Sequence, residues 1–437
     1  MSGPDALPDH RPWTFAILLM LANTLSFIDR QIVGLLVEPI KADLHLSDTQ
    51  IGLLYGLGFT LFYIAAAIPV AQIADRASRK LVVVASIASW SVATALCGLS
   101  RSFETFLAAR IGVGVGEGGL TPSALSLLAD LFPRDRLATA IALYQAGVYL
   151  GNALALILGG IVAHAVPPST ELVVSGLGIV RGWQLPFLLL LAPGLVLALV
   201  LLRMREPPRR APDADGERRP AALLPQLRAR APVYAAIMGG FALLVLGGNG
   251  AQFWTPALVQ RSFDWPTHLV GHWLGWTTLA FGATGVLAGG MAADRLARRA
   301  PAAGPAVASA LGMAGMVPLA FAFPLLPTPG TMLAAVAAHQ WLSAFALSGG
   351  MATLQTITPT HMRARVLALQ MVLINLAGTL AGPTLIGMLA DRIGAAGGGL
   401  AMAMALIGGG SGALAAMAMA MAARSCRSRA ATIGAGA

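Results

Sequence analysis

Long apolar stretches recur along nearly the whole chain and leave room only for short loops between most of them. Each is close to or above the ~20 residues that an α-helix needs to cross a bilayer. Only 11% of the residues are charged, whereas a soluble domain carries about 25%. We therefore predict an all-α integral membrane protein. Its twelve transmembrane helices are expected at 13–40, 49–72, 81–99, 104–131, 137–163, 183–203, 232–257, 269–291, 302–324, 331–357, 364–390 and 398–422.

A polar segment rich in arginine and proline lies between the sixth and seventh predicted helices. It divides the chain into parts that we expect to be an N-terminal six-helix bundle, a linker, a C-terminal six-helix bundle and a tail. Their predicted boundaries are 1–203, 204–231, 232–422 and 423–437.

Basic residues gather in alternate loops, on the same side as the linker. Because loops rich in lysine and arginine stay in the cytoplasm, both termini and the linker are expected to be cytoplasmic, with the protein in the cell inner membrane. The first apolar stretch is too long for a signal peptide, so we expect it to be the first membrane helix. The net charge of +10 is dispersed over these loops and does not indicate a nucleic-acid partner.

The two halves repeat a charged loop. Ala74-Asp75-Arg76 follows the second predicted helix, and Ala293-Asp294-Arg295 follows the eighth. An aspartate at a helix end can face the positive N-terminus of another helix, and such a contact can form in one gating state and break in another. We predict a cytoplasmic latch, with charges that only set the topology as the alternative. The predicted latch residues are Asp75, Arg76, Arg79, Asp294 and Arg295.

Four ionisable residues interrupt two of the predicted helices: Asp29 and Arg30 in the first, Arg110 and Glu117 in the fourth. A charge in hydrocarbon costs roughly 2.5 kcal/mol or more, so such groups normally face a protein interior or a wet cavity. Arg110 and Glu117 lie seven residues apart, nearly two turns, and so share a helix face. We suggest that Glu117 pairs with Arg30 and Asp29 with Arg110, although the sequence does not fix the partners.

These four residues suit two roles in transport. A guanidinium group matches phosphate or carboxylate, so Arg30 and Arg110 are candidates to bind an anionic substrate. A carboxylate among apolar helices can exchange a proton as its exposure changes, so Asp29 and Glu117 are candidates for proton coupling or gating. The alternative is a permanent ion-paired network that only fixes packing.

Further polar and aromatic side chains recur within the predicted helices of both halves. They are expected to line a central substrate cavity, with buried packing as the alternative for each. No cofactor or metal is predicted, because the paired histidines in the eighth helix lack further ligands and the glycine run near Glu117 lacks a nucleotide-binding βαβ unit. The candidates are Tyr144, Gln145, Tyr149, Asn152, Asn249, Gln252, Trp254, His339 and Asn375.

Several motifs resemble the spinster branch of the major facilitator superfamily. They include Phe27–Gln31, Leu46–Leu54 and, most specifically, Arg110–Gly119. The loop 72–80 resembles the superfamily signature G-x-L-a-D-r-x-G-r-[KR], although Ala71 or Gln72, and Ser78, stand where glycine is usual. The resemblance implies the major facilitator fold, in which two pseudo-symmetric six-helix bundles hold substrate between them.

The resemblance also implies a secondary transporter of small or amphipathic molecules, lysolipid-like and anionic, which is proton-coupled in some members. The aspartate-arginine pair at 29–30 occurs in anion:cation symporters too, so a symporter of organic carboxylates is an alternative. A membrane-embedded lipid-modifying enzyme would need a nucleophile, base or metal cluster, which we do not find. We therefore expect a monomeric transporter, not an enzyme, whose partners are its substrate, protons and the lipid bilayer.

Overall fold

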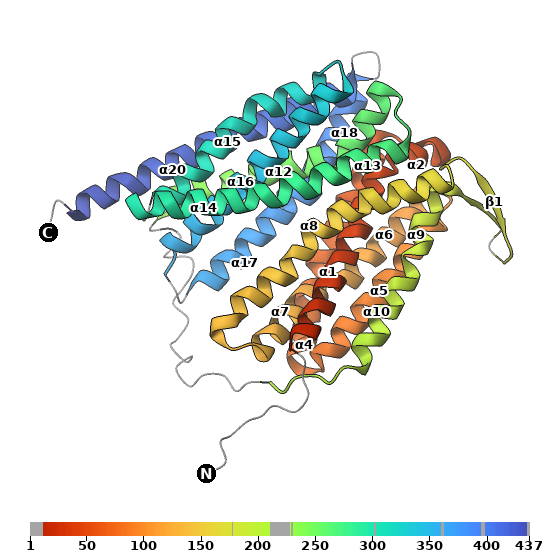
Figure 1. Ribbon diagram of the computed structural model, residues 1–437, viewed down its shortest axis with the longest axis horizontal. Helices are drawn as coiled ribbons and strands as arrows, with labels where there is room; N and C mark the ends of the chain where they lie inside the picture. Colours follow the sequence, from red (N-terminus) through yellow and green to blue (C-terminus); the bar gives the residue numbers. More distant parts are fainter. Residues whose placement is uncertain are drawn as a thin grey trace, which may run out of the picture. The chain divides into compact units, whose positions relative to one another are not determined.

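A computed structural model describes residues 12–176, 178–209, 228, 230–300, 303–359, 362–394 and 398–434. Most of these residues are helical, and β1 (Glu171–Val174) pairs with β2 (Gly178–Arg181) in an antiparallel hairpin (Figure 1). In the described part of the chain, 10 helices are long and apolar enough to cross a membrane. The predicted all-α membrane fold is confirmed, but the predicted number of twelve spans is not.

Two predicted spans account for the difference. The span predicted at 104–131 is divided into α6 (Phe103–Glu117) and α7 (Leu120–Leu131), with Gly118 and Gly119 between them. The span predicted at 269–291 falls on three consecutive elements, the last of which ends in a charged turn. These are α13 (Thr267–Thr277), the π-helical η3 (Thr278–Gly282) and α14 (Ala283–Arg299).

The chain forms two compact units. Unit 1 comprises Met1–Gln31, Phe62–Ala155 and Pro168–Arg218. In it α5 packs against both α6 and α10 (Figure 1). Side chains of Ser78 and Ser102 cap the N-termini of α5 and α6, which satisfies backbone donors that a helix leaves free. Besides β1, β2, α6 and α7, unit 1 contains α5 (Arg79–Gly98), η1 (Gly182–Gln184), α9 (Leu185–Leu189), α10 (Leu191–Arg203) and parts of α1 (Pro12–Leu35), α4 (Leu57–Arg76) and α8 (Arg134–Ala165).

Unit 2 comprises Ile32–Leu61, Leu156–Pro167 and Arg219–Ala437. In it α15 packs against α14, α16 and α20 (Figure 1). The apolar core that α15 shares with α12, α16 and α20 includes Phe241 and Met313. Its other elements are α2 (Val37–Leu44), α3 (Asp48–Tyr55), α12 (Ala231–Phe263), α15 (Gly304–Ala322), η4 (Phe323–Leu325), α16 (Pro329–Ile357), α17 (Arg363–Ile374), η6 (Asn375–Ala381), α18 (Gly382–Ile393), α19 (Gly399–Met404), η8 (Ala405–Gly409) and α20 (Gly410–Gly434).

The units divide the chain differently from the predicted bundles. Residues 32–61 and 156–167, from the predicted N-terminal bundle, group with unit 2. Most of the predicted linker, 204–231, lies outside the described residues. Helix α20 continues through Gly434, so most of the predicted tail extends the preceding helix. The predicted bundle boundaries stay a prediction.

Two glycines four residues apart let α8 approach α1 within unit 1. A Cβ atom on Gly147 would lie 2.6 Å from the carbonyl oxygen of Met20, and one on Gly151 would lie 2.5 Å from that of Thr24. Small residues at this spacing allow close backbone contact between membrane helices. The residues of α1 that carry the buried charges are therefore held against α8 over two turns.

Candidate functional site

The centre of the candidate site is an ion pair between α1 and α6 in unit 1. Arg30 binds one oxygen of Glu117 through two nitrogens, with Nη2–Oε2 at 2.5 Å and Nε–Oε2 at 2.9 Å. The hydroxyl of Ser26, one turn earlier on α1, donates to the same oxygen at 2.5 Å. The side chain of Glu117 is 0% exposed and that of Arg30 is 12% exposed. The pairing is the one suggested from the sequence.

Two aromatic rings hold the Arg30 guanidinium in place. Its Cζ atom lies 4.7 Å from the ring centroid of Phe27 and 5.0 Å from that of Tyr63. A guanidinium within about 6 Å of an aromatic centroid is attracted by the ring face. Since Phe27 lies on α1 and Tyr63 on α4, these contacts offset part of the cost of removing the cation from water and fix the direction of its donors.

Asp29 and Arg110 are buried beside this pair. The hydroxyl of Thr94, on α5, donates to Asp29 Oδ2 at 3.0 Å, and Arg110 Nη1 donates to the backbone oxygen of Asp29 at 3.5 Å. Asp29 is 3% exposed and Arg110 is 1% exposed. Arg110 therefore meets Asp29 at its main chain, and the predicted pairing of the two side chains stays a prediction.

Each carboxylate keeps one oxygen without a partner. Asp29 Oδ1 and Glu117 Oε1 are buried and accept no hydrogen bond from the described residues. A buried polar atom without a partner is costly and rare in native proteins, so each such oxygen marks a place where a proton or another donor can bind. The cluster is therefore not saturated with hydrogen bonds from the described residues.

The glycine run of α6 allows the helix to deliver Glu117 to this position. A Cβ atom on Gly116 would lie 2.8 Å from the backbone nitrogen of Trp90 and 2.8 Å from Ser89 Oγ. A Cβ atom on Gly112, one turn earlier, would lie 3.2 Å from the Cβ of Ala93. The backbones of α6 and α5 can therefore lie close together, as expected for small residues spaced four apart in membrane helices.

The predicted site residues on α8 point in different directions. Tyr144 is fully buried, and its hydroxyl lies 3.1 Å from Thr121 Oγ1. Gln145 is exposed, whereas Tyr149 and Asn152 are half-buried. Their spacing places the last three on one face of the helix. Tyr144 therefore belongs to the interior of unit 1, and the other three form a polar stripe on its surface.

Most predicted site residues in unit 2 contact residues of their own helix or of a neighbouring helix. Trp254 is 0% exposed and donates through Nε1 to the Pro383 oxygen at 2.9 Å. His339 is buried, with its ring centroid 5.4 Å from that of Phe323. These contacts favour the packing alternative for both side chains.

The three remaining candidates in unit 2, all with amide side chains, are half-buried. Asn249 Nδ2 lies 3.5 Å from Thr379 Oγ1, and Asn375 Nδ2 donates to the Met371 oxygen at 2.9 Å. Gln252 lies three residues after Asn249 on the same helix. Their role in binding substrate stays a prediction.

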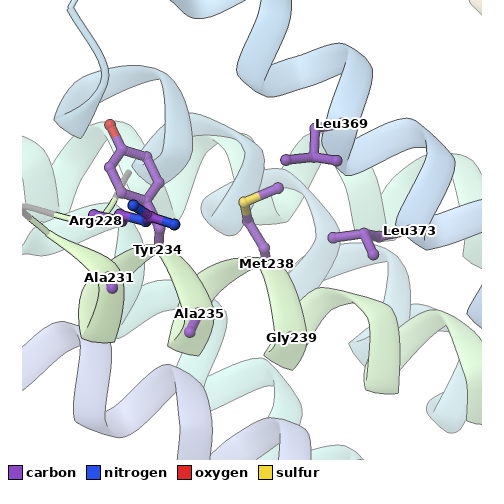
Figure 2. A pocket seen from close by; sticks show the side chains of 8 residues that line it. All are labelled: Arg228, Ala231, Tyr234, Ala235, Met238, Gly239, Leu369 and Leu373. Carbon is purple, nitrogen blue, oxygen red and sulfur yellow. The ribbon is translucent and has the colours of Figure 1, made fainter. Parts of the chain in front are cut away.

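A groove of about 400 Å³ lies between α12 and α17 in unit 2 (Figure 2). Its wall is almost wholly apolar, with one arginine, and it includes none of the predicted site residues. The groove was not predicted from the sequence, because its lining side chains are typical of lipid-facing helix surfaces. They are Arg228, Ala231, Tyr234, Ala235, Met238, Gly239, Leu369 and Leu373.

The predicted latch residues differ in their surroundings. Asp75, Arg76, Asp294 and Arg295 are exposed, whereas Arg79 is 4% exposed. Arg79 pairs with Asp130 at the end of α7 and, through Nε at 3.5 Å, with Glu206 Oε1 just after α10. These two acidic partners were not predicted from the sequence, since they lie about 50 and 130 residues away along the chain.

The first linker residues bind the same loop. Arg209 Nη2 donates to the carbonyl oxygens of Ala74 at 2.7 Å and Ala77 at 2.8 Å, and Nη1 donates to that of Asp75. The last carbonyls of a helix have no partner within the helix, and a cation there also opposes the helix dipole. Arg209 therefore caps the C-terminus of α4.

A charged cluster in unit 2 was also missed. Arg261 binds Asp48 through Nη1 at 2.7 Å and Nη2 at 2.6 Å, and Glu38 through Nε at 2.7 Å. Lys41 also pairs with Asp48. Lys41 and Arg261 are among the few basic residues outside the basic loops. Their unusual position was the one feature of the sequence that could have indicated this cluster. Among the described residues, no group of three or more His, Cys, Asp or Glu side chains is arranged to hold a metal ion.

Comparison with known proteins connects this arrangement to transporters. The sequence model of the Major Facilitator Superfamily matches residues 19–382. An MFS-type efflux pump of Mycolicibacterium smegmatis is 31% identical over 310 residues, which are 69% of each chain. Protein spinster homolog 1 of Xenopus tropicalis is 28% identical over 408 residues, 87% of this chain and 73% of the relative.

Solved structures agree with these relatives. A bacterial homolog of the human lysosomal transporter Spinster, in an inward-facing and unoccupied conformation, is similar with a TM-score of 0.78 and 25% identity over 96% of both chains. A D-xylose–proton symporter, with a TM-score of 0.71 and 17% identity, shares the fold. The chain belongs to the Major Facilitator Superfamily, in its spinster-like branch, and is a multi-pass membrane transporter rather than an enzyme.

Proposed function

We propose that this protein moves a small anionic organic or amphipathic molecule across the membrane by alternating access, and that protons drive the movement. The observation that carries the proposal is the buried pair of Arg30 and Glu117, 2.5 Å apart. Breaking a buried ion pair is costly unless a new partner replaces the lost one. A substrate anion and a proton are the replacements that this pair requires.

Arg30 is the proposed anion-binding group. Its fork binds a carboxylate oxygen through two nitrogens, and the same geometry suits the carboxylate or phosphate of a substrate. Because its side chain is the more exposed member of the pair, an arriving anion can displace Glu117 from it. Arg110, buried in the same unit, adds a second positive charge.

Glu117 and Asp29 are the proposed proton carriers. When Arg30 turns to a substrate anion, the Glu117 carboxylate loses its cation in a buried setting. A charged group without a partner in such a setting is strongly disfavoured, so it binds a proton. The unpartnered oxygens Glu117 Oε1 and Asp29 Oδ1 are where this proton can bind without breaking another hydrogen bond.

The preferred substrate class is a lysolipid-like anion. The similarity to spinster proteins supports it. An organic carboxylate, carried by symport with a cation, is the second candidate. The motif of adjacent Asp29 and Arg30 fits this substrate class equally well. The proposed setting is a monomer in the cell inner membrane, with cytoplasmic termini.

The experiment is flux into proteoliposomes that contain purified protein, with an imposed pH gradient. Fluorescent lysophosphatidylglycerol and radiolabelled succinate are the two probes, so that the two substrate classes are compared directly. Glu117→Gln should abolish proton-driven flux while insertion and folding are kept. The matched control is Glu104→Gln, an exposed carboxylate on the same helix, which should transport normally. Unchanged proton-driven flux in Glu117→Gln would overturn the proton role of Glu117.

A further inference from the structure

Besides the loop at 72–80 and its repeat at 293–295, the superfamily signature occurs at the opposite end of the helices. Gly387-Met388-Leu389-Ala390-Asp391-Arg392-Ile393-Gly394 follows the pattern G-x-L-a-D-r-x-G with both glycines present. The copy at 72–80 lacks those glycines. The new copy ends α18, the fifth predicted helix of the second half, whereas the loop at 72–80 follows the second predicted helix of the first half. Successive spans run in opposite directions, so the two copies lie at opposite ends of the helices.

The aspartate of this copy binds the start of another helix within unit 2. Asp391 Oδ1 accepts a hydrogen bond from the backbone nitrogen of Asp48 at 3.1 Å. Asp391 Oδ2 accepts from the Thr49 backbone nitrogen at 2.8 Å and from Thr49 Oγ1 at 2.6 Å. These nitrogens belong to the first turn of α3, where donors are free and the helix dipole favours an anion. It is the contact expected of a latch aspartate.

Both glycines of the new copy have a structural reason. A Cβ atom on Gly387 would overlap the backbone oxygen of Asp48 and lie 3.1 Å from the Trp254 ring. Only glycine therefore lets α18 lie against the start of α3. Gly394 ends α18 with φ at +78°, a backbone conformation that favours glycine. The first eight positions of the signature are thus matched in geometry as well as in letters, whereas Ala395 and Ala396 stand where its two basic residues are usual.

A charged cluster extends this contact to α12. Asp48, whose backbone binds Asp391, uses its carboxylate to bind Arg261 of α12 and Lys41 of α2. Arg261 also binds Glu38 of α2. The segment 37–49 from the first half of the chain is therefore tied to α12 and α18 from the second half by hydrogen bonds and ion pairs within one compact unit.

We propose that Asp391 and the first turn of α3, together with the Glu38–Asp48–Arg261 cluster, form a second latch, which closes the end of the transport path opposite the loop 75–80. The inference rests on the proposed alternating access. Each half of this fold contains two inverted three-helix repeats, so a latch loop at one end has a counterpart at the other. In this structure the second latch is formed, while the Asp75 and Asp294 side chains are exposed. The two latches alternate.

The test is hydrogen–deuterium exchange of the full chain in lipid nanodiscs, read by mass spectrometry. Asp391→Asn removes the charge and keeps the size of an exposed side chain, so the fold is retained. Exchange in the first turn of α3 should become faster by about tenfold, because charge-assisted hydrogen bonds are lost. Exchange at residues 74–80 should become slower in the same sample, since releasing one latch favours closure of the other.

The control variant is Glu171→Gln, which removes an exposed carboxylate paired with Arg181 on the hairpin and should change neither region. A second variant, Gly387→Ala, keeps the aspartate but separates α18 from α3, and should shift both regions as Asp391→Asn does. Faster exchange at α3 without slower exchange at 74–80 would overturn the latch and leave a simple helix cap. Flux measured in parallel separates the hypotheses: reciprocal exchange without flux of either probe contradicts the proposed substrates and leaves the latch standing.

Discussion

Arg30 is a cation in a membrane helix, and neighbouring side chains take the place of water around its guanidinium group. The carboxylate of Glu117 balances its charge, and the rings of Phe27 and Tyr63 cover its faces. Removing one partner of such a pair leaves the other charge buried, which costs about 3–5 kcal/mol. Replacing both side chains with glutamine leaves two neutral amides, and burying these costs far less than burying one unpaired charge.

We therefore expect Arg30 and Glu117 to be coupled in a double-mutant cycle. Arg30→Gln should lower the free energy of unfolding by about 3 kcal/mol, and Glu117→Gln by a similar amount. The double variant should be less destabilised than the sum, with an interaction energy of about 1–3 kcal/mol. The measurement is denaturant unfolding in detergent micelles. Strictly additive losses would show that the two side chains do not interact in the folded protein.

At the scale of elements, the position of Glu117 depends on how closely α6 approaches α5. Gly116 precedes Glu117 and faces the backbone of Trp90. Any larger side chain there must push the two helices apart, and overpacking of this kind typically costs about 1–3 kcal/mol. Packing between two helices thus decides whether the ion pair can form.

We therefore predict that Gly116→Val lowers the thermal unfolding midpoint and reduces flux at the same time, because the displaced helix carries Glu117 with it. The matched control is Val115→Ala, which alters an exposed neighbour of the same helix and should change both quantities little. Thermal unfolding by intrinsic tryptophan fluorescence and flux into proteoliposomes are the two measurements. Normal flux in a destabilised Gly116→Val protein would contradict the link between the two.

At the scale of the whole molecule, the distribution of basic residues predicts the orientation in the membrane. One membrane crossing separates the hairpin β1–β2 from the residues after α10, because the span Gly182–Arg203 lies between them. Loops rich in arginine stay in the cytoplasm, and the segment after α10 is such a loop. The two regions are expected to lie on opposite sides.

Single cysteines test this orientation in intact cells. A membrane-impermeant maleimide should label Val173→Cys, whose parent side chain is 87% exposed, but should label Arg205→Cys only after the cells are opened. The native Cys97 and Cys426 are buried, and a variant without added cysteine measures their background. Labelling of Arg205→Cys in intact cells would reverse the proposed orientation.

Part of the site could be predicted from the sequence because burying a charge is costly wherever the chain folds. Asp29, Arg30, Arg110 and Glu117 were identifiable as a cluster on this ground alone, and a spacing of seven residues placed two of them on one helix face. The contact between Arg110 and the backbone of Asp29 could not be predicted in this way, since it depends on the rotation of α6 against α1. Nor could Trp254, which donates a hydrogen bond to the Pro383 oxygen, be told from a residue that lines a cavity.

The sequence by itself determined that this protein is a helical membrane transporter, since apolar length and signature loops depend only on the order of residues along the chain. Only the tertiary structure decided which charges meet. Arg79 binds Asp130 and Glu206, and Asp391 caps α3, across separations of 51 to 343 residues. Contacts of this kind depend on helix packing, because a side chain reaches only a few ångströms and many partners of the right charge are available along the chain.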